Sequence, residues 1–186
     1  MRDVIGEKAD VCGKTYRVIR LLGHGKSGYS YLVTRDRMQY VLKQIHHEPC
    51  DYFHFGNKIV AEDYAYSRLL SLDVRIPQMI AIDLDKERII KEYIEGETIF
   101  DIVMRQGTAE MYLPQIRKIA ENARMAGVNL DYFPTNYVVS HHLLYYVDYE
   151  VNEYSEKWNF DNWGIQYWSK TPAFMQHLKD CGKLQE

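Results

Sequence analysis

Five polar residues, far apart in the chain, have the types and the order that phosphate chemistry requires: Lys43, Glu62, Asp131, Asn136 and Asp148. A lysine can neutralise phosphate charge, and a carboxylate can orient either that lysine or an attacking hydroxyl. Aspartate and asparagine oxygens are the hard ligands that Mg²⁺ prefers. Each residue also has an ordinary alternative, such as a surface lysine, a turn aspartate or a loop cap.

The stretch LLGHGKSGYSYLV adds three closely spaced glycines before the first of these residues. A Walker A loop would need a glycine five positions before Gly25, where Arg20 stands. A dinucleotide-binding fingerprint would need a helix after the glycines, whereas the following residues read as a strand. The remaining interpretation is a glycine-rich hairpin whose backbone approaches phosphate, with a plain β-turn as the alternative. The candidate phosphate-binding residues are Gly23, Gly25, Lys26, Ser27 and Gly28.

The elements that would position these residues follow from hydrophobic periodicity and turn signals. We expect strands at 16–22, 29–34, 40–45, 79–84 and 88–94, with a helix at 58–70. We then expect helices at 99–104 and 111–125, a strand pair turning at His141 and His142, and a helix through 174–178. Strands followed by helices predict an α+β fold.

In this order, the residues resemble those of the protein-kinase-like superfamily, from about Tyr16 to Asp148. The resemblance is to a minimal atypical member of the branch that contains RIO and lipopolysaccharide (Kdo) kinases. It implies a two-lobed fold with a five-stranded antiparallel N-lobe plus one helix over residues 1–94. Residues 95–186 would form a truncated, mainly helical C-lobe with the catalytic loop and the metal-binding aspartate.

The same resemblance implies the cofactors ATP and Mg²⁺ and a role for each site residue. Lys43 would pair with the α- and β-phosphates while Glu62 orients it, and Asp131 would act on the attacking hydroxyl. Asn136 and Asp148 would hold the metal. Adenine would be bound by the backbone of a hinge that contains Glu92, Ile94 and Gly96.

Several positions depart from the family pattern. Asn129 and Leu130 replace the usual His-Arg before Asp131, and Phe133 stands where serine/threonine kinases often have a lysine. Asp148 is followed by Tyr149-Glu150 rather than Phe-Gly, and Lys91 precedes the hinge, where a neutral residue is usual. Asp161–Gly164 (DNWG) resembles a buried motif of the central C-lobe helix, but follows Asp148 too soon for a full activation loop.

Composition sets limits on the remaining functions. A net charge of −3 gives no electrostatic case for nucleic acid, and no apolar run reaches the roughly 18 residues that span a membrane. Three widely spaced cysteines support no disulfide framework, so a cytoplasmic setting is expected. A cluster at His46, His47, Cys50 and His54 favours a solvated loop over a metal site, and the tryptophans are expected in the core: Trp158, Trp163 and Trp168.

The leading hypothesis is an ATP- and Mg²⁺-dependent phosphotransferase that acts on a hydroxyl, of the kind labelled serine/threonine protein kinase. Its partners would be a nucleotide and an unidentified acceptor, either a protein or a small molecule. One alternative is a catalytically weak pseudokinase that serves as a nucleotide-binding interaction module, which the missing His-Arg favours. Another is a kinase of a sugar, lipid or antibiotic, which Phe133 and Glu150 favour.

Overall fold

The computed structural model describes residues 6–48 and 57–182, which divide into two compact units. The first unit comprises Met1–Tyr66 and Pro77–Tyr93, and the second comprises Ser67–Ile76 and Ile94–Glu186. Residues 67–76 therefore belong with the second unit, although they precede the last two strands of the first.

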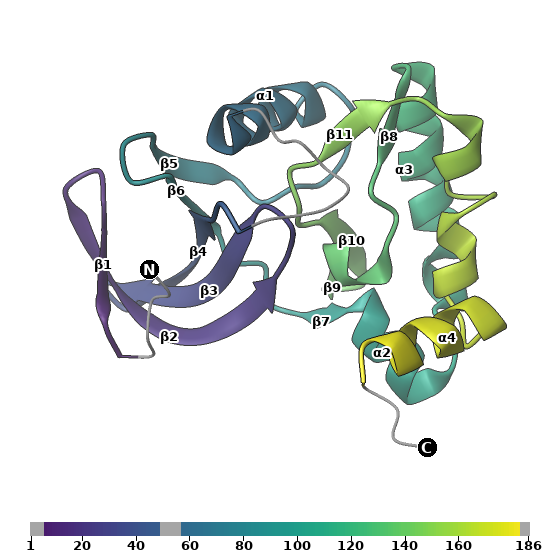
Figure 1. Cartoon of the computed structure of the whole chain (residues 1–186). Coiled ribbons are helices and arrows are strands. Elements are labelled where there is room, and N and C mark those ends of the chain that lie inside the picture. The colour runs from purple at the N-terminus through teal and green to yellow at the C-terminus, as the bar shows by residue number, and fades with distance from the viewer. Residues whose placement is uncertain (1–5, 49–56, 183–186) are drawn as a thin grey trace. The chain divides into compact units, whose positions relative to one another are not determined.

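The first unit is built on one antiparallel sheet of six strands in the order β1-β2-β3-β4-β6-β5, which curls strongly (Figure 1). The predicted five-stranded sheet is therefore wrong by one strand, because β1 is short and carries charged residues at Lys8 and Asp10 that hide its alternation. The strands are β1 (Lys8–Val11), β2 (Lys14–His24), β3 (Gly28–Arg35), β4 (Met38–Ile45), β5 (Met79–Asp83) and β6 (Arg88–Glu92), with helix α1 (Lys58–Leu69) between β4 and β5.

Two tight hairpins connect the central strands of this sheet. Asp36 and Arg37 have φ values of 52° and 66° between β3 and β4, which gives the turn the twist that the flanking strands need. The glycine-rich stretch forms the hairpin between β2 and β3, as the strand-like residues after it predict. A Cβ at Gly28 would lie 2.6 Å from the carbonyl oxygen of Gln44, so only glycine lets β3 pair this closely with β4.

Apolar residues alternate along these strands and create two buried clusters. One cluster lies within the curl of the sheet and includes Tyr16, Val33, Leu42 and Ile90. The second contains Ile45 and Ile89 from the sheet together with Ile59 from α1. Because Ile59 is 1% exposed, its burial fixes the face that α1 turns toward the sheet.

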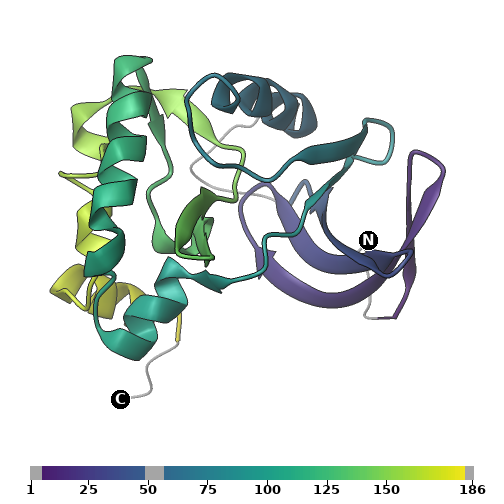
Figure 2. The ribbon, with the colours of Figure 1, turned by 180° about the vertical axis from the view of Figure 1, so that it is seen from behind.

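The second unit combines three α-helices with two small antiparallel sheets (Figure 2). The sheets have the orders β10-β9-β7 and β11-β8, and neither β7, β8 nor β11 was predicted from the sequence. The elements are β7 (Glu97–Thr98), α2 (Ile99–Gln106), α3 (Leu113–Met125), β8 (Val128–Leu130), β9 (Tyr137–Ser140), β10 (Leu143–Tyr146), β11 (Val151–Glu153) and α4 (Pro172–Asp180).

Local signals set the ends of these helices. The Thr98 hydroxyl accepts a hydrogen bond from the Asp101 backbone at the start of α2, and Gly107 ends the helix with φ 88°. Thr171 caps α4 in the same way and Pro172 follows it. The buried faces of the three helices carry Ile99, Phe100 and Val103; Ile116, Ile119 and Ala123; and Phe174 and Leu178.

The prediction that all three tryptophans lie in the core is correct only for Trp168. Trp168 is 1% exposed and its indole N–H donates to the carbonyl of Tyr132 at 3.0 Å, whereas Trp158 is 49% exposed. Asp161 is also exposed, so the DNWG stretch does not form a buried helical motif. Among the residues that the structure describes, no helix is long and apolar enough to cross a membrane.

Candidate functional site

Lys43 and Glu62 form an ion pair inside the first unit. Lys43 lies on β4 and Glu62 on α1, and their side chains are 8% and 7% exposed. Burial of Ile59 on the same helix turns Glu62 toward the sheet, because residues three apart share a helix face. The structure thus brings together the two residues that the sequence analysis pairs, in surroundings where charge is weakly screened.

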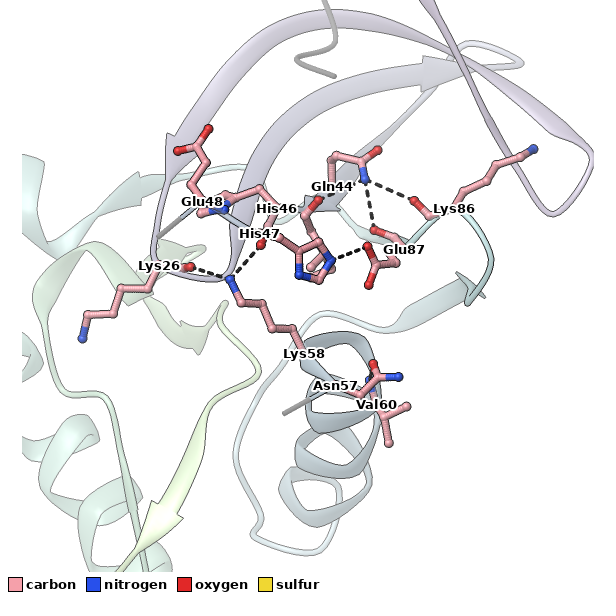
Figure 3. Close-up of polar contacts among 11 residues, drawn as sticks. Lys26, Gln44, His46, His47, Glu48, Asn57, Lys58, Val60, Lys86 and Glu87 are labelled. Carbon is pink, nitrogen blue, oxygen red and sulfur yellow. Dashed lines mark hydrogen bonds and ion pairs between the residues drawn. The ribbon is translucent and has the colours of Figure 1, made fainter. Parts of the chain in front are cut away.

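The glycine-rich hairpin is hydrogen-bonded to helix α1. The Ser27 hydroxyl donates to Glu62 Oε1 at 3.2 Å. Lys58 Nζ, from the first turn of α1, donates to the carbonyls of Lys26 at 3.1 Å and His46 at 2.7 Å (Figure 3). Lys58 is buried, and sequence reasoning missed it. Its position four residues before Glu62 on the same helix face is the signal that could have identified it.

The first two glycines of the hairpin have open surroundings. A Cβ at Gly23 or Gly25 would meet no described atom within 4 Å, in contrast to Gly28. The backbone N–H of Gly25 donates to the Gly28 carbonyl at 3.0 Å, and the Gly25 carbonyl lies 2.9 Å from His46 Nε2. Packing does not explain these two glycines, so the space beside them is available to a ligand that approaches the backbone.

A buried carboxylate oxygen lies beside this hairpin. Glu62 Oε2 has no hydrogen-bond partner among the described residues, although Oε1 is engaged by Lys43 and Ser27. A buried acceptor without a partner costs free energy. Glu62 Oε2 is therefore available to accept a hydrogen bond from a water molecule, or from a neighbouring group that moves when a ligand binds.

In the second unit, Asp131 and Asn136 occupy one compact loop after β8. Asp131 Oδ1 accepts the backbone N–H of Phe133 at 3.0 Å, and the Asn136 amide donates to the Asp131 carbonyl at 3.5 Å. The backbone carbonyl of Asn136 accepts from Val147 at 2.8 Å, which ties the loop to the residue before Asp148. Asp148 Oδ1 in turn accepts the backbone N–H of Tyr149 at 2.9 Å.

Two buried tyrosines lie within the electrostatic influence of Asp131 and Asp148. Burial raises the pKa of Tyr137 and of Tyr146 well above the ordinary value, and the negative charges of Asp131 and Asp148 raise both pKa values further. The Tyr146 hydroxyl donates to the Glu150 carbonyl and lies 3.3 Å from the Asp131 backbone nitrogen. Hydrogen bonds therefore link the loop of Asp131 and Asn136 to Tyr146 of β10 and to the residue before Asp148.

This donor set fits Mg²⁺. The carboxylate of Asp148 and the amide oxygen of Asn136 are hard oxygen ligands, and no soft sulfur or imidazole donor is needed. When bound, the ion would supply positive charge to phosphate oxygens. Asp148 and Asn136 are the residues that would hold it.

The departures from the family pattern have local structural explanations. Phe133 packs in an aromatic cluster, with its ring 4.7 Å from His177 and 5.1 Å from Tyr167. Asn129 is buried, and its amide donates to the Ser155 carbonyl at 2.7 Å beside the β8–β11 pair. Phe133 thus contributes to an aromatic cluster, and Asn129 bonds beside a strand pair, in the second unit.

The predicted hinge residues are divided between structural roles. Glu92 ends β6, and its carboxylate accepts the backbone N–H of Gln78 at 3.1 Å. A Cβ at Gly96 would collide with the carbonyl of Val139, so glycine permits the linker to pack on β9. Ile94 is half-buried, and Lys91 on β6 is buried.

Of the histidines and cysteine for which the sequence favours a solvated loop, the structure describes His46 and His47, and these two have different neighbours. His47 is exposed and bonds to Glu87 at 2.7 Å, whereas His46 lies beside His24 of the glycine-rich hairpin. Cys50 and His54 lie outside the described residues. His141 and His142 form the β9–β10 turn with positive φ angles, as predicted.

The chain was compared with known proteins on sequence and on structure. No protein-family model matches the sequence, and no curated protein matches it. Among solved structures, it resembles the BubR1 kinase domain with a TM-score of 0.60 and 14% sequence identity, over 84% of this chain and 54% of that chain. The likeness shows a kinase-like fold, and the chain spans about half the length of the matched structure. The more specific relation to RIO or lipopolysaccharide kinases stays a prediction.

Proposed function

We propose that this protein is an ATP- and Mg²⁺-dependent phosphotransferase that transfers a γ-phosphate to a hydroxyl group. The observation that carries the proposal is the buried Lys43–Glu62 ion pair, joined to the glycine-rich hairpin through the Ser27 hydroxyl. The kinase-like fold supports it, since charge and position, rather than covalent chemistry by the protein, suffice for phosphoryl transfer.

Each unit would contribute a different part of the chemistry. In the first unit, Lys43 would neutralise the α- and β-phosphates, and the open space at Gly23 and Gly25 would let the phosphates approach the hairpin backbone. In the second unit, Asp148 and Asn136 would hold the metal, and Asp131 would accept a hydrogen bond from the acceptor hydroxyl. The fixed orientation of Asp131 by the Phe133 N–H would limit the reorganisation that the reaction requires.

In the proposed transfer, the acceptor oxygen forms a bond to the γ-phosphorus while the bond from that phosphorus to the β,γ-bridging oxygen breaks. ADP leaves with the electron pair of the broken bond. The hydroxyl proton passes to the Asp131 carboxylate and then to solvent. Lys43 balances the charge that develops on the departing diphosphate.

The test is γ-phosphate transfer from labelled ATP with Mg²⁺, using the full chain and two classes of acceptor. One class is a generic protein with exposed serines and threonines, and the other is a panel of sugars, lipids and aminoglycosides. Asp131→Asn should lower kcat by about 10²–10⁴-fold, the usual range for loss of a general base. Equal turnover in wild type, Asp131→Asn and Asp148→Asn would contradict the proposal.

A second candidate is a nucleotide-binding interaction module without turnover. The observation that favours it is Asn129, which is buried and donates to the Ser155 carbonyl at 2.7 Å, at a position where the active enzymes of the family have part of a His-Arg pair. This alternative predicts binding of ATP with no transfer to any acceptor and no hydrolysis. The labelled-ATP assay therefore separates the two functions directly.

A further inference from the structure

Three side chains that the proposed function does not use converge beside the glycine-rich hairpin. His24 ends β2, whereas His46 and Glu48 follow β4, and each offers one potential metal ligand within 4.8 Å of the other two. His24 Nε2 lies 3.2 Å from His46 Nε2 and 3.5 Å from Glu48 Oε2. All three residues belong to the first unit.

We propose that His24, His46 and Glu48 form a Zn²⁺-binding site. Zinc bonds to histidine nitrogen are about 2.0–2.1 Å long, so neighbouring ligands of a tetrahedral ion lie about 3.3 Å apart. The two distances from His24 match this spacing. Two histidines and one carboxylate are an established zinc donor set that leaves a fourth position for water. The side chains of His24 and Glu48 are each 46% exposed, so an ion can reach them.

Tyr29 holds two of the three ligands in place. Its hydroxyl donates to Glu48 Oε1 at 2.7 Å, which leaves the other carboxylate oxygen directed toward His24. The His24 ring stacks on the Tyr29 ring with centroids 4.2 Å apart and planes within 8°. Tyr29 is itself buried, so its position is fixed by packing. It can therefore orient the two metal ligands that it contacts.

His46 must exchange one set of bonds for another when the ion binds. Its Nδ1 accepts the backbone N–H of Glu48 at 3.2 Å, so the neutral ring carries its proton on Nε2, which lies 2.9 Å from the Gly25 carbonyl. Coordination through Nε2 moves that proton to Nδ1. Both hydrogen bonds are then lost, and the Gly25 carbonyl is released.

Zinc would therefore replace the hydrogen bond between His46 and the Gly25 carbonyl with stronger metal–ligand bonds to His24 and His46. Because His24 lies between Gly23 and Gly25, the ion would tie the end of β2 to the segment after β4. The site does not depend on nucleotide binding or on catalysis. It would exist equally in a phosphotransferase and in an interaction module.

The experiment is a Zn²⁺ titration of the full chain against a chromophoric chelator, together with the visible spectrum of the Co²⁺-substituted protein. We expect one ion per chain, bound by nitrogen and oxygen ligands. Glu48→Gln keeps the shape of the side chain and should weaken Zn²⁺ binding at least about 100-fold, as should His24→Ala. Tyr29→Phe keeps the ring and should weaken it about 10–100-fold, the usual cost of losing an outer-shell partner.

The matched control is His47→Ala, which removes the neighbouring exposed histidine and should leave the affinity unchanged. Circular dichroism of the zinc-free variants checks that each is folded. The proposal is overturned if wild type binds no Zn²⁺ below millimolar concentration. It is equally overturned if Glu48→Gln and His24→Ala bind as wild type, while loss of His47, Cys50 or His54 abolishes binding.

Discussion

Removal of one partner from the Lys43–Glu62 pair should destabilise the first unit strongly. Lys43→Met leaves the Glu62 carboxylate buried, with Oε2 still lacking a partner among the described residues and only Ser27 donating to Oε1. Breaking a buried ion pair costs about 3–5 kcal/mol, and the remaining Ser27 bond places the expected loss near the lower limit, about 3 kcal/mol. For a chain of this length, that loss lowers the Tm by about 6–12 °C.

The assay is urea unfolding followed by far-ultraviolet circular dichroism, for wild type, Lys43→Met, Glu62→Leu and the double variant. Because replacement of a whole buried pair by apolar residues is often neutral, the double variant should recover most of the lost stability. Lys86→Met, which breaks the exposed pair with Asp10 in the same unit, should change stability little. A loss below about 1 kcal/mol for Lys43→Met, or purely additive effects in the double variant, would refute the reasoning.

Two further predictions follow from the hairpin and from the buried tyrosines. Gly25→Val has open space for its side chain, so the protein should stay folded and lose affinity for ATP more than for AMP. If calorimetry finds that Gly25→Val binds ATP and AMP as tightly as wild type does, the hairpin is a plain turn. The free energy of unfolding should fall as pH rises above about 10, because tyrosines of the unfolded chain then lose protons. In the folded chain, burial raises the pKa of Tyr132 to about 12 and raises the pKa values of Tyr137 and Tyr146 well above the ordinary value. Each of these tyrosines steepens the fall by up to about 1.4 kcal/mol per pH unit, and tyrosinate absorbance that rises before circular dichroism is lost would contradict this account.

Most long elements were predictable because their signals are local. Runs of β-branched, aromatic and aliphatic residues identified β3 and β4. Helical spacing predicted α1 to within one residue of its C-terminal end. The short strands β7, β8 and β11 were missed, because two or three residues carry too little periodicity and pair with partners far along the chain. β1 was missed because half of its residues are charged and its alternation is brief.

Site residues could be predicted where their order along the chain matches a known motif. Contacts between residues that become neighbours only when the chain folds could not be predicted. Lys43 and Glu62 were paired from their positions on a strand and the next helix, and the structure places them in contact. Lys58 was missed because its bonds go to backbone carbonyls, whose residue types do not identify them as partners, although its spacing from Glu62 places it on the same helix face. His46 was grouped with nearby histidines, whereas the pairing of β2 with β3 and of β3 with β4 brings it to His24.

The most direct measurement of the central claim is the affinity of the full chain for ATP, with and without Mg²⁺, by calorimetry and thermal shift. Binding to the native state alone raises its stability by RT ln(1 + [L]/Kd), about 2.7 kcal/mol at a hundredfold excess over Kd. We predict Mg²⁺-dependent binding to wild type and to Asp131→Asn, and at least about tenfold weaker binding, about 1.4 kcal/mol, to Lys43→Met and Asp148→Asn. No binding by wild type at millimolar ATP, or equal binding by all four proteins, would contradict the account.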